Sequence, residues 1–323
     1  MSRGLLPLVP VYAAAVGAKN LAYNHAWVRP QRLHAPVVSI GNLSVGGSGK
    51  TPLTIRLAEL LRERDIAVDV LSRGYGRQSA QVARVDPHGP WQQFGDEPLL
   101  IAQRTGVPVY VGASRYSAGQ LAESQSPATQ LHLLDDGFQH RRLARVVDIV
   151  VLHRSDFAER LLPAGRLREP FSSLRRADIF VLREGDAEFE PDLRARGLHQ
   201  PIWWMSRQLQ LPGITSAVAF CAIARPDEFL AGVAGTRILA SRTARDHHVW
   251  TDRDISDLIG LQRQHNAAVF LTTEKDLVRL APAQRRTLAQ AAPLHAVRLD
   301  VRLDDEPACI EQLLRLAAPA HQR

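Results

Sequence analysis

The chain is poor in cysteine. Its 323 residues include only Cys221 and Cys309, which lie far apart and without the spacing of metal ligands. This scarcity excludes a disulfide framework and a structural zinc site, and it suits a reducing cytoplasm. The sequence also has no internal repeat and no low-complexity tract.

Lysine is scarce as well: apart from Lys19, Lys50 and Lys275, every basic residue of the Lys and Arg class is an arginine. The formal net charge of +7 indicates an anionic partner, which on composition alone could be nucleic acid, an anionic lipid or a phosphorylated substrate. With 45% hydrophobic residues, a chain of this length can build two moderate cores, so we expect two domains.

A glycine-rich segment at residues 44–51, Ser-Val-Gly-Gly-Ser-Gly-Lys-Thr, lies between an apolar run at 36–40 and a helix-like run at 53–64. Such a turn exposes backbone N–H groups that wrap a phosphate, while its lysine reaches the phosphates and its threonine can bind Mg²⁺. The first residue departs from the usual pattern, which opens with glycine or alanine. The residues expected at the nucleotide phosphates are Ser44, Val45, Gly46, Gly47, Ser48, Gly49, Lys50 and Thr51.

The longest hydrophobic run, Leu5 to Ala18, is shorter than the roughly 20 residues that a membrane-spanning helix needs. We expect an uncleaved helix that lies on the inner leaflet of a membrane. A signal peptide is disfavoured because the phosphate loop indicates a cytoplasmic reaction, whereas a helix packed on the protein core remains an alternative. The side chains expected at the membrane interface are Tyr12, Tyr23, Trp27, Arg29 and Arg32.

Short apolar strands alternate with helical segments from residue 36 onward, which predicts a P-loop NTPase-like α/β fold with a parallel sheet and helices on both faces. Beyond an extended segment, further strand-like and helical runs predict a second, smaller α/β domain, with a substrate cleft between the two. The expected boundaries are 1–35 for the membrane-surface helix and its lead-in, 36–200 for the nucleotide-binding domain, 201–213 for an extended linker, 214–297 for the smaller domain, and 298–323 for a return strand and C-terminal helix.

Two aspartates end the apolar run at 131–134. Two adjacent carboxylates at the end of a buried strand destabilise the fold unless a cation or hydrogen-bond donors compensate their charge. We therefore expect Asp135 and Asp136 to bind Mg²⁺ near the glycine-rich loop. A capped turn is the structural alternative. Arginines also follow or flank the strand ends, and one or two of them are expected to contact phosphate oxygens. These arginines are Arg115, Arg141, Arg142, Arg166 and Arg168.

Three further segments carry groups with possible roles in catalysis. Asp96 and Glu97 precede a helix, where a carboxylate could accept a proton from a hydroxyl or simply cap the helix. The segment at 246–248, Asp-His-His, could supply a histidine that titrates near neutrality, although such a pair is often surface charge. The segment at 272–276, Thr-Thr-Glu-Lys-Asp, matches a helix-capping pattern, which is its favoured interpretation.

Taken together, these motifs resemble the tetraacyldisaccharide 4'-kinase family, the lipid A 4'-kinases of Gram-negative bacteria. The resemblance covers nearly the whole chain. The motifs that carry it are Gly41-Asn42-Leu43 with the glycine-rich loop, Leu71 to Gly76, Gly95 to Pro98, Asp135 to His140, Phe220-Cys221 with Ala224 to Pro226, Asp246 to His248, and Thr272 to Asp276.

The resemblance implies transfer of the γ-phosphate of ATP to the 4'-hydroxyl of a tetraacyldisaccharide 1-phosphate, which gives lipid IVA at the cytoplasmic face of the inner membrane. It implies that Asp96 is the catalytic base, that His247 is its partner, with His248 as the alternative, and that Lys50 stabilises developing charge. It further implies Mg²⁺ at Thr51 and the aspartate pair. The residues implied around the phosphates are Gln139, Arg115 and Arg168. We expect a monomer that does not bind nucleic acid.

Two alternatives remain at this point. One is another P-loop enzyme, such as a kinase for a different acceptor or a GTPase-like metallochaperone. Its guanine-reading Asn-Lys-x-Asp segment has no good match, because Glu274 stands where asparagine belongs. The other is a basic ATPase that binds nucleic acid, but no interleaving of aromatic and basic residues supports it.

Overall fold

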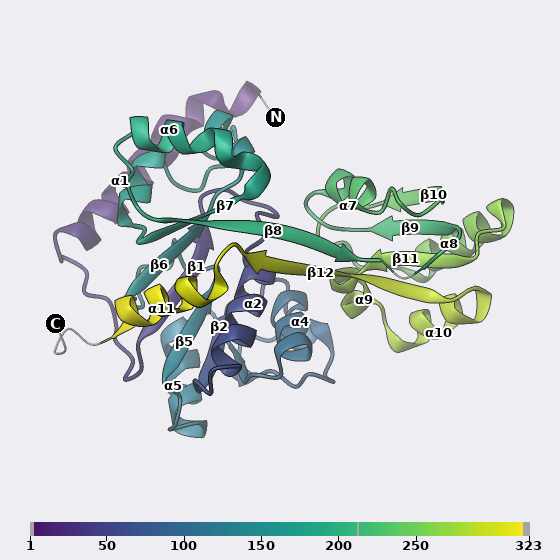
Figure 1. The fold of residues 1–323 in the computed structure, drawn as a ribbon, viewed down its shortest axis with the longest axis horizontal. Coiled ribbons are helices and arrows are strands. Elements are labelled where there is room, and N and C mark those ends of the chain that lie inside the picture. The colour runs from purple at the N-terminus through teal and green to yellow at the C-terminus, as the bar shows by residue number, and fades with distance from the viewer. Residues whose placement is uncertain (1–2, 212, 319–323) are drawn as a thin grey trace.

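The computed structural model describes residues 3–211 and 213–318, and all structural statements concern these residues. A twelve-stranded sheet runs through the molecule in the order β10-β9-β11-β12-β8-β7-β6-β1-β5-β2-β4-β3. Two lobes share this sheet, and β8 and β12 connect them as a pair of antiparallel strands (Figure 1). The strands β3 and β4 form the other antiparallel pair, and the remaining neighbours are parallel.

The strands are β1 (Val37–Asn42), β2 (Val68–Ser72), β3 (Ala83–Arg84), β4 (Val109–Val111), β5 (Leu131–Asp135), β6 (Val147–Val151), β7 (Ile179–Arg183), β8 (Ile202–Gln210), β9 (Ala217–Cys221), β10 (Ile238–Thr243), β11 (Val269–Thr273) and β12 (Leu294–Leu303).

The α-helices are α1 (Val9–Asn24), α2 (Lys50–Arg62), α3 (Trp91–Phe94), α4 (Asp96–Thr105), α5 (Arg115–Gln125), α6 (Glu190–Ala195), α7 (Pro226–Gly232), α8 (Asp252–His265), α9 (Glu274–Arg279), α10 (Pro282–Ala291) and α11 (Glu306–Ala317). The 3₁₀ helices are η1 (Arg3–Leu8), η2 (Arg154–Ala158), η3 (Phe171–Arg176) and η4 (Glu184–Phe189).

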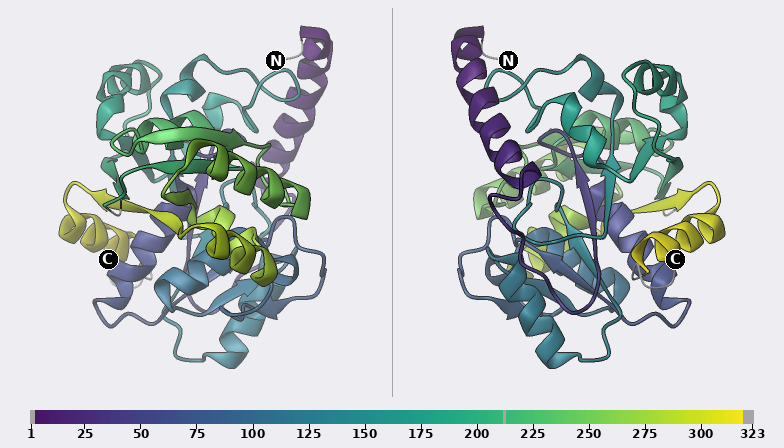
Figure 2. Two further views of the ribbon diagram at one scale, coloured as in Figure 1. Left: turned by 90° about the vertical axis from the view of Figure 1, so that its right-hand side faces the viewer. Right: turned by 90° about the vertical axis from the view of Figure 1, so that its left-hand side faces the viewer.

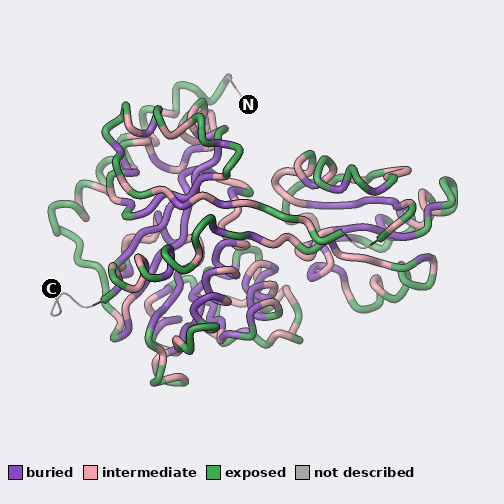
Figure 3. Tube along the Cα trace, in the orientation of Figure 1, coloured by how far each residue is buried: buried purple, intermediate pink, exposed green. Residues whose placement is uncertain are grey.

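The large lobe has the expected P-loop α/β fold. Its central strands β1, β2, β5 and β6 are buried over their whole length (Figure 3), as strands covered on both faces must be. Along β1, Val38 and Ile40 pack with α2, α4 and α11, whereas Val37 packs with α5 on the opposite face. The C-terminal ends of these parallel strands therefore open together at one edge, where ligands of such sheets bind.

The small lobe repeats this layering. Phe220 and Phe270 of its sheet pack against α8 and α10 on one face, while Cys221 and Leu271 pack against α7 on the other. The segment that sequence analysis treats as an extended linker contains β8, which pairs with β7 of the large lobe and with β12. The connection between the lobes is thus a hydrogen-bonded ribbon that continues the sheet.

The N-terminal helix stands apart from both cores. It runs along one side of the large lobe, and its first turns project beyond the rest of the molecule (Figure 2). No residue of α1 is buried, so the alternative of a helix packed in the core does not describe it. Together, η1 and α1 give 21 helical residues over Gly4–Asn24, with a mean hydropathy of 1.4 in an 18-residue window, a longer apolar helix than the sequence predicts. A helix of this length and composition could cross a membrane, but signal sequences can have the same length and composition.

Candidate active site

The glycine-rich loop joins β1 to α2 at the ligand-binding edge of the sheet. Gly46 and Gly49 have φ angles of +104° and +99°, which a residue with a side chain rarely adopts. A β-carbon on Gly46 would also collide with the guanidinium of Arg166. The loop ends at the N-terminus of α2, where free backbone N–H groups and the helix dipole favour an anion.

The opening residue of the loop has a structural role. Ser44 is 3% exposed and forms an isolated antiparallel bridge with Leu167. Next to it, the backbone N–H of Val45 donates to the carbonyl of Arg166 over 2.8 Å, and the Arg166 guanidinium donates back to the Val45 carbonyl over 3.1 Å. The segment around Arg166 therefore supports the loop from outside, and a serine at position 44 fits this pairing.

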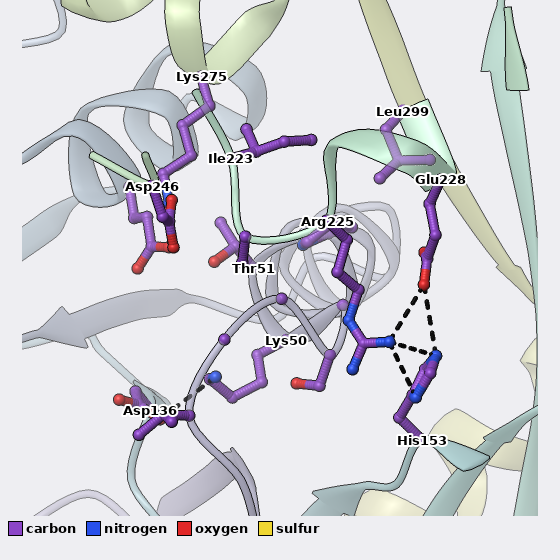
Figure 4. Close-up of a pocket in the computed structure, with 18 of the residues that line it drawn as sticks. Lys50, Thr51, Asp136, His153, Ile223, Arg225, Glu228, Asp246, Lys275 and Leu299 are labelled. Atoms are coloured by element: carbon purple, nitrogen blue, oxygen red, sulfur yellow. Dashed lines mark hydrogen bonds and ion pairs between the residues drawn. The ribbon is translucent and has the colours of Figure 1, made fainter. Parts of the chain in front are cut away.

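Three side chains expected at the phosphates form one cluster beside the loop with Asp136, which was expected to bind Mg²⁺. Lys50 Nζ lies 3.5 Å from Asp136 Oδ1 (Figure 4), and Arg168 donates to both oxygens of Asp136 over 2.8 and 2.9 Å. Arg168 also donates to Gln139, whose amide in turn donates to the carbonyl of Asn42 at the end of β1. Burial raises the pKa of the Asp136 carboxyl, but the charges of Lys50 and Arg168 outweigh it and lower the pKa to about 2.

Asp135 has a different environment from its neighbour. Its carboxylate is buried and accepts hydrogen bonds from the hydroxyls of Thr54, at 3.4 Å, and Ser72, at 3.2 Å. Burial, with the nearby negative charges of Glu97 and Asp136, raises the pKa of this carboxyl to about 7. An ionised carboxylate at this position is therefore short of positive charge, which a bound cation would supply.

The residues present fit a magnesium ion. The described residues hold no cluster of three or more His, Cys, Asp or Glu that would form an all-protein metal site. Mg²⁺, however, is usually held by one or two carboxylates together with substrate phosphates. Asp135 offers such a carboxylate, and the buried hydroxyl of Ser48 in the loop has no hydrogen-bond partner among the described residues. Both oxygens are groups that a nucleotide with its metal ion would satisfy.

Arg115 is not brought into this cluster. It begins α5, is 6% exposed and donates to the carbonyl of Ala113 over 3.0 Å. Burial, together with the charge of Arg73, lowers its pKa to about 10. Arg115 does not occur among the described residues that line the cleft. The start of its helix fixes the side chain inside the lobe, where it reaches Asp135 and Asp136 only through its charge.

The second predicted pair meets across the two lobes. Asp96 begins α4 of the large lobe, and its Oδ2 lies 3.0 Å from Nδ1 of His247, which belongs to the small lobe. His247 has a φ angle of +61°, and its ring packs on Tyr75 with centroids 5.0 Å apart. Its neighbour His248 instead bonds Asp254 over 3.0 Å. The structure therefore brings His247, and not His248, to Asp96.

Two cationic residues at Asp96 were not foreseen. Arg279 Nε donates to Asp96 Oδ2 over 2.8 Å, and Lys275 Nζ lies 3.9 Å from the same oxygen. Burial raises the pKa of the Asp96 carboxyl, but His247, Lys275 and Arg279 outweigh it and hold the pKa well below its usual range. The expected helix cap is present, since Thr273 Oγ1 accepts from the N–H of Asp276. That cap explains the sequence pattern but not the positions of the two cations that follow it.

A third cluster joins the lobes near the loop. Arg225 of the small lobe bonds His153 of the large lobe over 2.7 Å and Glu228 over 3.2 Å (Figure 4). Glu228 also accepts from Arg183 and Arg207. These contacts connect the loop after β6, the end of β7, β8 and α7. Arg225 lies in one of the motifs that carry the family resemblance, but no local pattern predicts these contacts, because the partners come from separate parts of the chain.

A cleft of about 1290 Å³ lies between these clusters. It is lined by the glycine-rich loop, by Asp135 and Asp136, and on the small-lobe side by Asp246, His247 and Lys275. Tyr12, Val16 and Lys19 of α1 line it as well. One continuous space thus connects a phosphate-binding loop, the histidine that contacts Asp96, and an exposed apolar helix.

Comparison with known proteins gives consistent matches. Residues 1–318 match the family model described as tetraacyldisaccharide-1-P 4'-kinase. The tetraacyldisaccharide 4'-kinase of Koribacter versatilis is 41% identical over 96% of this chain and 98% of its own length. That of Chromobacterium violaceum is 37% identical over 86% of this chain and 83% of its own length.

A solved structure shows the same fold. It is the "apo" form of LpxK from Aquifex aeolicus in complex with ATP, which is 30% identical and superposes with a TM-score of 0.78 over 98% of this chain and 99% of that chain. The family model matches almost the full length of the chain, and these relatives and this structure agree with it. The chain belongs to the tetraacyldisaccharide-1-phosphate 4'-kinase family.

Proposed function

We propose that this chain transfers the γ-phosphate of ATP to the 4'-hydroxyl of tetraacyldisaccharide 1-phosphate, which forms lipid IVA in lipid A biosynthesis. The observation that carries the proposal is that Lys50 and His247 line one cleft from its two sides, and that His247 is hydrogen-bonded to the buried carboxylate of Asp96. A phosphate-binding loop alone suits many nucleotide enzymes. A buried, ionised carboxylate opposite that loop is what transfer to a hydroxyl acceptor requires.

The reaction exchanges one P–O bond for another. The 4'-oxygen forms a bond to the γ-phosphorus, the bond from that phosphorus to the β–γ bridging oxygen breaks, and ADP leaves with the electron pair. Asp96 accepts the proton of the hydroxyl, and His247 orients the carboxylate through Nδ1. Lys50 stabilises the negative charge on the transferring phosphoryl group. Gln139 and Arg168 hold the surrounding phosphate side of the cleft in place.

The aspartate pair and the hydroxyl of Thr51 would hold Mg²⁺. When bound, the ion supplies positive charge that neutralises the phosphate oxygens and the buried carboxylate of Asp135. Before the ion binds, Lys50 and Arg168 keep Asp136 ionised, since both lie within ion-pair distance of its carboxylate. The negative charge of Asp136 is thus already neutralised by protein cations, whereas that of Asp135 needs a bound cation.

The N-terminal helix supports a site of action at the cytoplasmic face of the inner membrane. Its apolar residues are exposed (green and pink in Figure 3), and its cleft-lining residues would let acyl chains remain in or near the bilayer while the sugar reaches the cleft. The end of the helix nearest the cleft carries positive charge that suits lipid head groups. Burial lowers the pKa of the Lys19 amine, Glu169 opposes this, and the charges of Arg176, Arg141 and Arg145 lower the pKa further.

The experiment that tests the function is direct. The purified chain is incubated with γ-labelled ATP, Mg²⁺ and a tetraacyldisaccharide 1-phosphate in detergent micelles, and the product is analysed for label at the 4' position. We expect labelled lipid IVA. A product without label at that position would refute the proposal, and a matched reaction without the lipid acceptor measures background hydrolysis of ATP.

A further inference from the structure

Arg279 is a fully buried cation at the site. It ends α9 of the small lobe, and its side chain is 0% exposed. Its Nε donates to Asp96 Oδ2 over 2.8 Å, the same oxygen that His247 contacts at 3.0 Å. The other oxygen, Oδ1, accepts the backbone N–H of Glu97 over 2.9 Å. The carboxylate is therefore fixed from both lobes.

The arginine is itself held rigidly. Its Nη1 donates to the carbonyl of Ala222 over 2.8 Å and lies 3.5 Å from Asp276. Its backbone carbonyl accepts the indole N–H of Trp91, which belongs to the large lobe, over 3.0 Å. A planar guanidinium with this many fixed contacts presents its Nε–H in one direction, and that direction is toward Asp96.

Other charges near Asp96 are shared more widely. Lys275 of α9 lies closer to Glu97, at 2.9 Å, than to Asp96, at 3.9 Å, and it also faces Asp246 at 3.8 Å. Its positive charge is thus divided among three carboxylates. The loop before α8 contributes His247 and Asp246, α4 contributes Glu97, and α9 contributes Asp276 in addition to its two cations. Arg279 is the fixed cation with a direct hydrogen bond to the base.

We propose that Arg279 is a positioning residue, which holds the Asp96 carboxylate ionised and oriented toward the acceptor hydroxyl. This inference rests on the proposed function, in which Asp96 is the base. Arg279 makes its contact from the small lobe, so the base is complete only when the two lobes are packed together at α4 and α9. A buried carboxylate without this cation would favour its protonated form, which cannot accept a proton.

The test compares two arginines that cross the same interface. Arg279→Met removes the cation at Asp96. Arg104→Met is the matched control, because Arg104 lies on α4 and pairs with Glu274 of α9 and Asp300 of β12, both at 2.7 Å, without a hydrogen bond to Asp96. The measurement is the pH dependence of kcat and kcat/KM from pH 5 to 9, together with KM for ATP.

In the unsubstituted chain the pKa of Asp96 is held well below its usual range, so we expect no acid limb from this group between pH 5 and 9. For Arg279→Met we expect loss of the cation to raise the pKa of Asp96 until an acid limb of kcat/KM enters this range, with kcat at neutral pH reduced about tenfold or more. KM for ATP should stay within about twofold of the original value, because ATP binds at the other side of the cleft. Arg279→Lys should remove part of the new limb, and Arg104→Met should keep the original pH profile. An unchanged pH profile in Arg279→Met, or the same new limb in both methionine variants, would overturn the proposal.

A second measurement separates this inference from the proposed function. Urea unfolding of Asp96→Asn, Arg279→Met and the double variant forms a thermodynamic cycle that needs no substrate. We expect the two substitutions to be non-additive, with the second one costing less once the first is present. Additive effects would refute the contact itself. Failure of the chain to phosphorylate the lipid would refute the function and leave this cycle intact. If Arg279→Met does not fold, Arg279→Lys carries the same pH profile and cycle.

Discussion

The hydroxyl of Tyr12 donates a hydrogen bond of 2.9 Å to the backbone carbonyl of Arg168, whose guanidinium binds Asp136 beside the glycine-rich loop. Two turns further along α1, Lys19 donates to the backbone carbonyl of Gln139 over 2.9 Å. The side chains of Arg168 and Gln139 contact each other. The exposed apolar helix is therefore attached to the residues that organise the phosphate side of the site.

Removing one of these attachments should slow the reaction. We expect Tyr12→Phe to lower kcat about two- to tenfold, the range given by loss of one hydrogen bond of about 0.5–1.5 kcal/mol. The measurement is steady-state transfer in detergent micelles. Tyr23→Phe is the control, because the ring of Tyr23 packs under Arg141 and phenylalanine preserves that ring. Equal rates for Tyr12→Phe and the unsubstituted chain would show that the attachment has no part in turnover.

The lysine of the loop provides a test of the phosphate site. Lys50→Ala removes the charge that faces Asp136 and the transferring phosphoryl group, so we expect phosphoryl transfer to fall by at least about 100-fold. Transfer is measured with labelled ATP at saturating acceptor. Circular dichroism and thermal melting show whether the variant keeps its fold. Normal activity in a folded Lys50→Ala variant would contradict the assignment of the loop.

Asp96 can be tested by an isosteric change. Asp96→Asn keeps the size of the side chain but cannot take up the hydroxyl proton, so we expect kcat to fall about 10²- to 10⁴-fold. ATP affinity, measured by titration calorimetry, should change little because the loop is untouched. Turnover that survives this substitution would assign the base to another group.

The two adjacent histidines should behave differently. His247→Gln removes the contact to Asp96 and should reduce kcat, whereas His248→Gln removes a contact to Asp254 at the start of α8. Asp254 also accepts hydrogen bonds from Thr251, its helix cap, so the second variant should lose stability and keep most of its turnover. Activity assays and urea unfolding of both variants check this difference. The reverse pattern would place His248 at the active site.

A buried histidine that does not line the cleft should make stability depend on pH. His132 in β5 is fully buried, with Nδ1 2.7 Å from Asp69 and Nε2 3.4 Å from Glu123. Burial lowers the pKa of the imidazole, but the two carboxylates outweigh it and raise the pKa above its ordinary value. Protonated His132 therefore stabilises the fold. This contribution is complete below about pH 6.5, the unfolded pKa, and is lost as pH rises through the raised folded value.

The measurement is the free energy of unfolding in urea between pH 6 and pH 9. We expect the difference between the unsubstituted chain and His132→Gln to shrink as pH rises. His265→Gln serves as the control, because His265 is exposed. A difference that stays constant, or that grows with pH, would contradict a protonated histidine at this position.

The sequence predicts the fold class and the phosphate loop well, for local reasons. The apolar run before the loop, the glycines within it and the helix after it are adjacent in the chain, and family membership sets aside the alternatives of a GTPase-like metallochaperone and a nucleic-acid-binding ATPase. The continuous sheet was not predicted. The pairing of β8 with β12 joins residues about 90 positions apart, and no local pattern reports such a partner.

The contacts of Lys275 and Arg279 with Asp96 could not be predicted from local sequence either. Thr273 and Asp276 form a helix cap, so the sequence around Lys275 and Arg279 is already explained by local structure. Their second role depends on α9 packing against α4 across the lobes. Arg115 shows the opposite case: the sequence favours a phosphate contact, while the helix start directs the side chain into the lobe. Arginines near strand ends cannot be ranked without knowing where each helix begins.

The ribbon of β8 and β12 has a consequence for how the protein is made. The chain leaves the large lobe along β8 and returns along β12, and only then does α11 place Ile310 and Leu313 in the core beside α2. During synthesis the small lobe gains its last strand pairing at Val297, while the part of the large-lobe core that α11 covers is still exposed. The large lobe is therefore the last to close, so we expect it to rely on protection from aggregation until α11 has been synthesised.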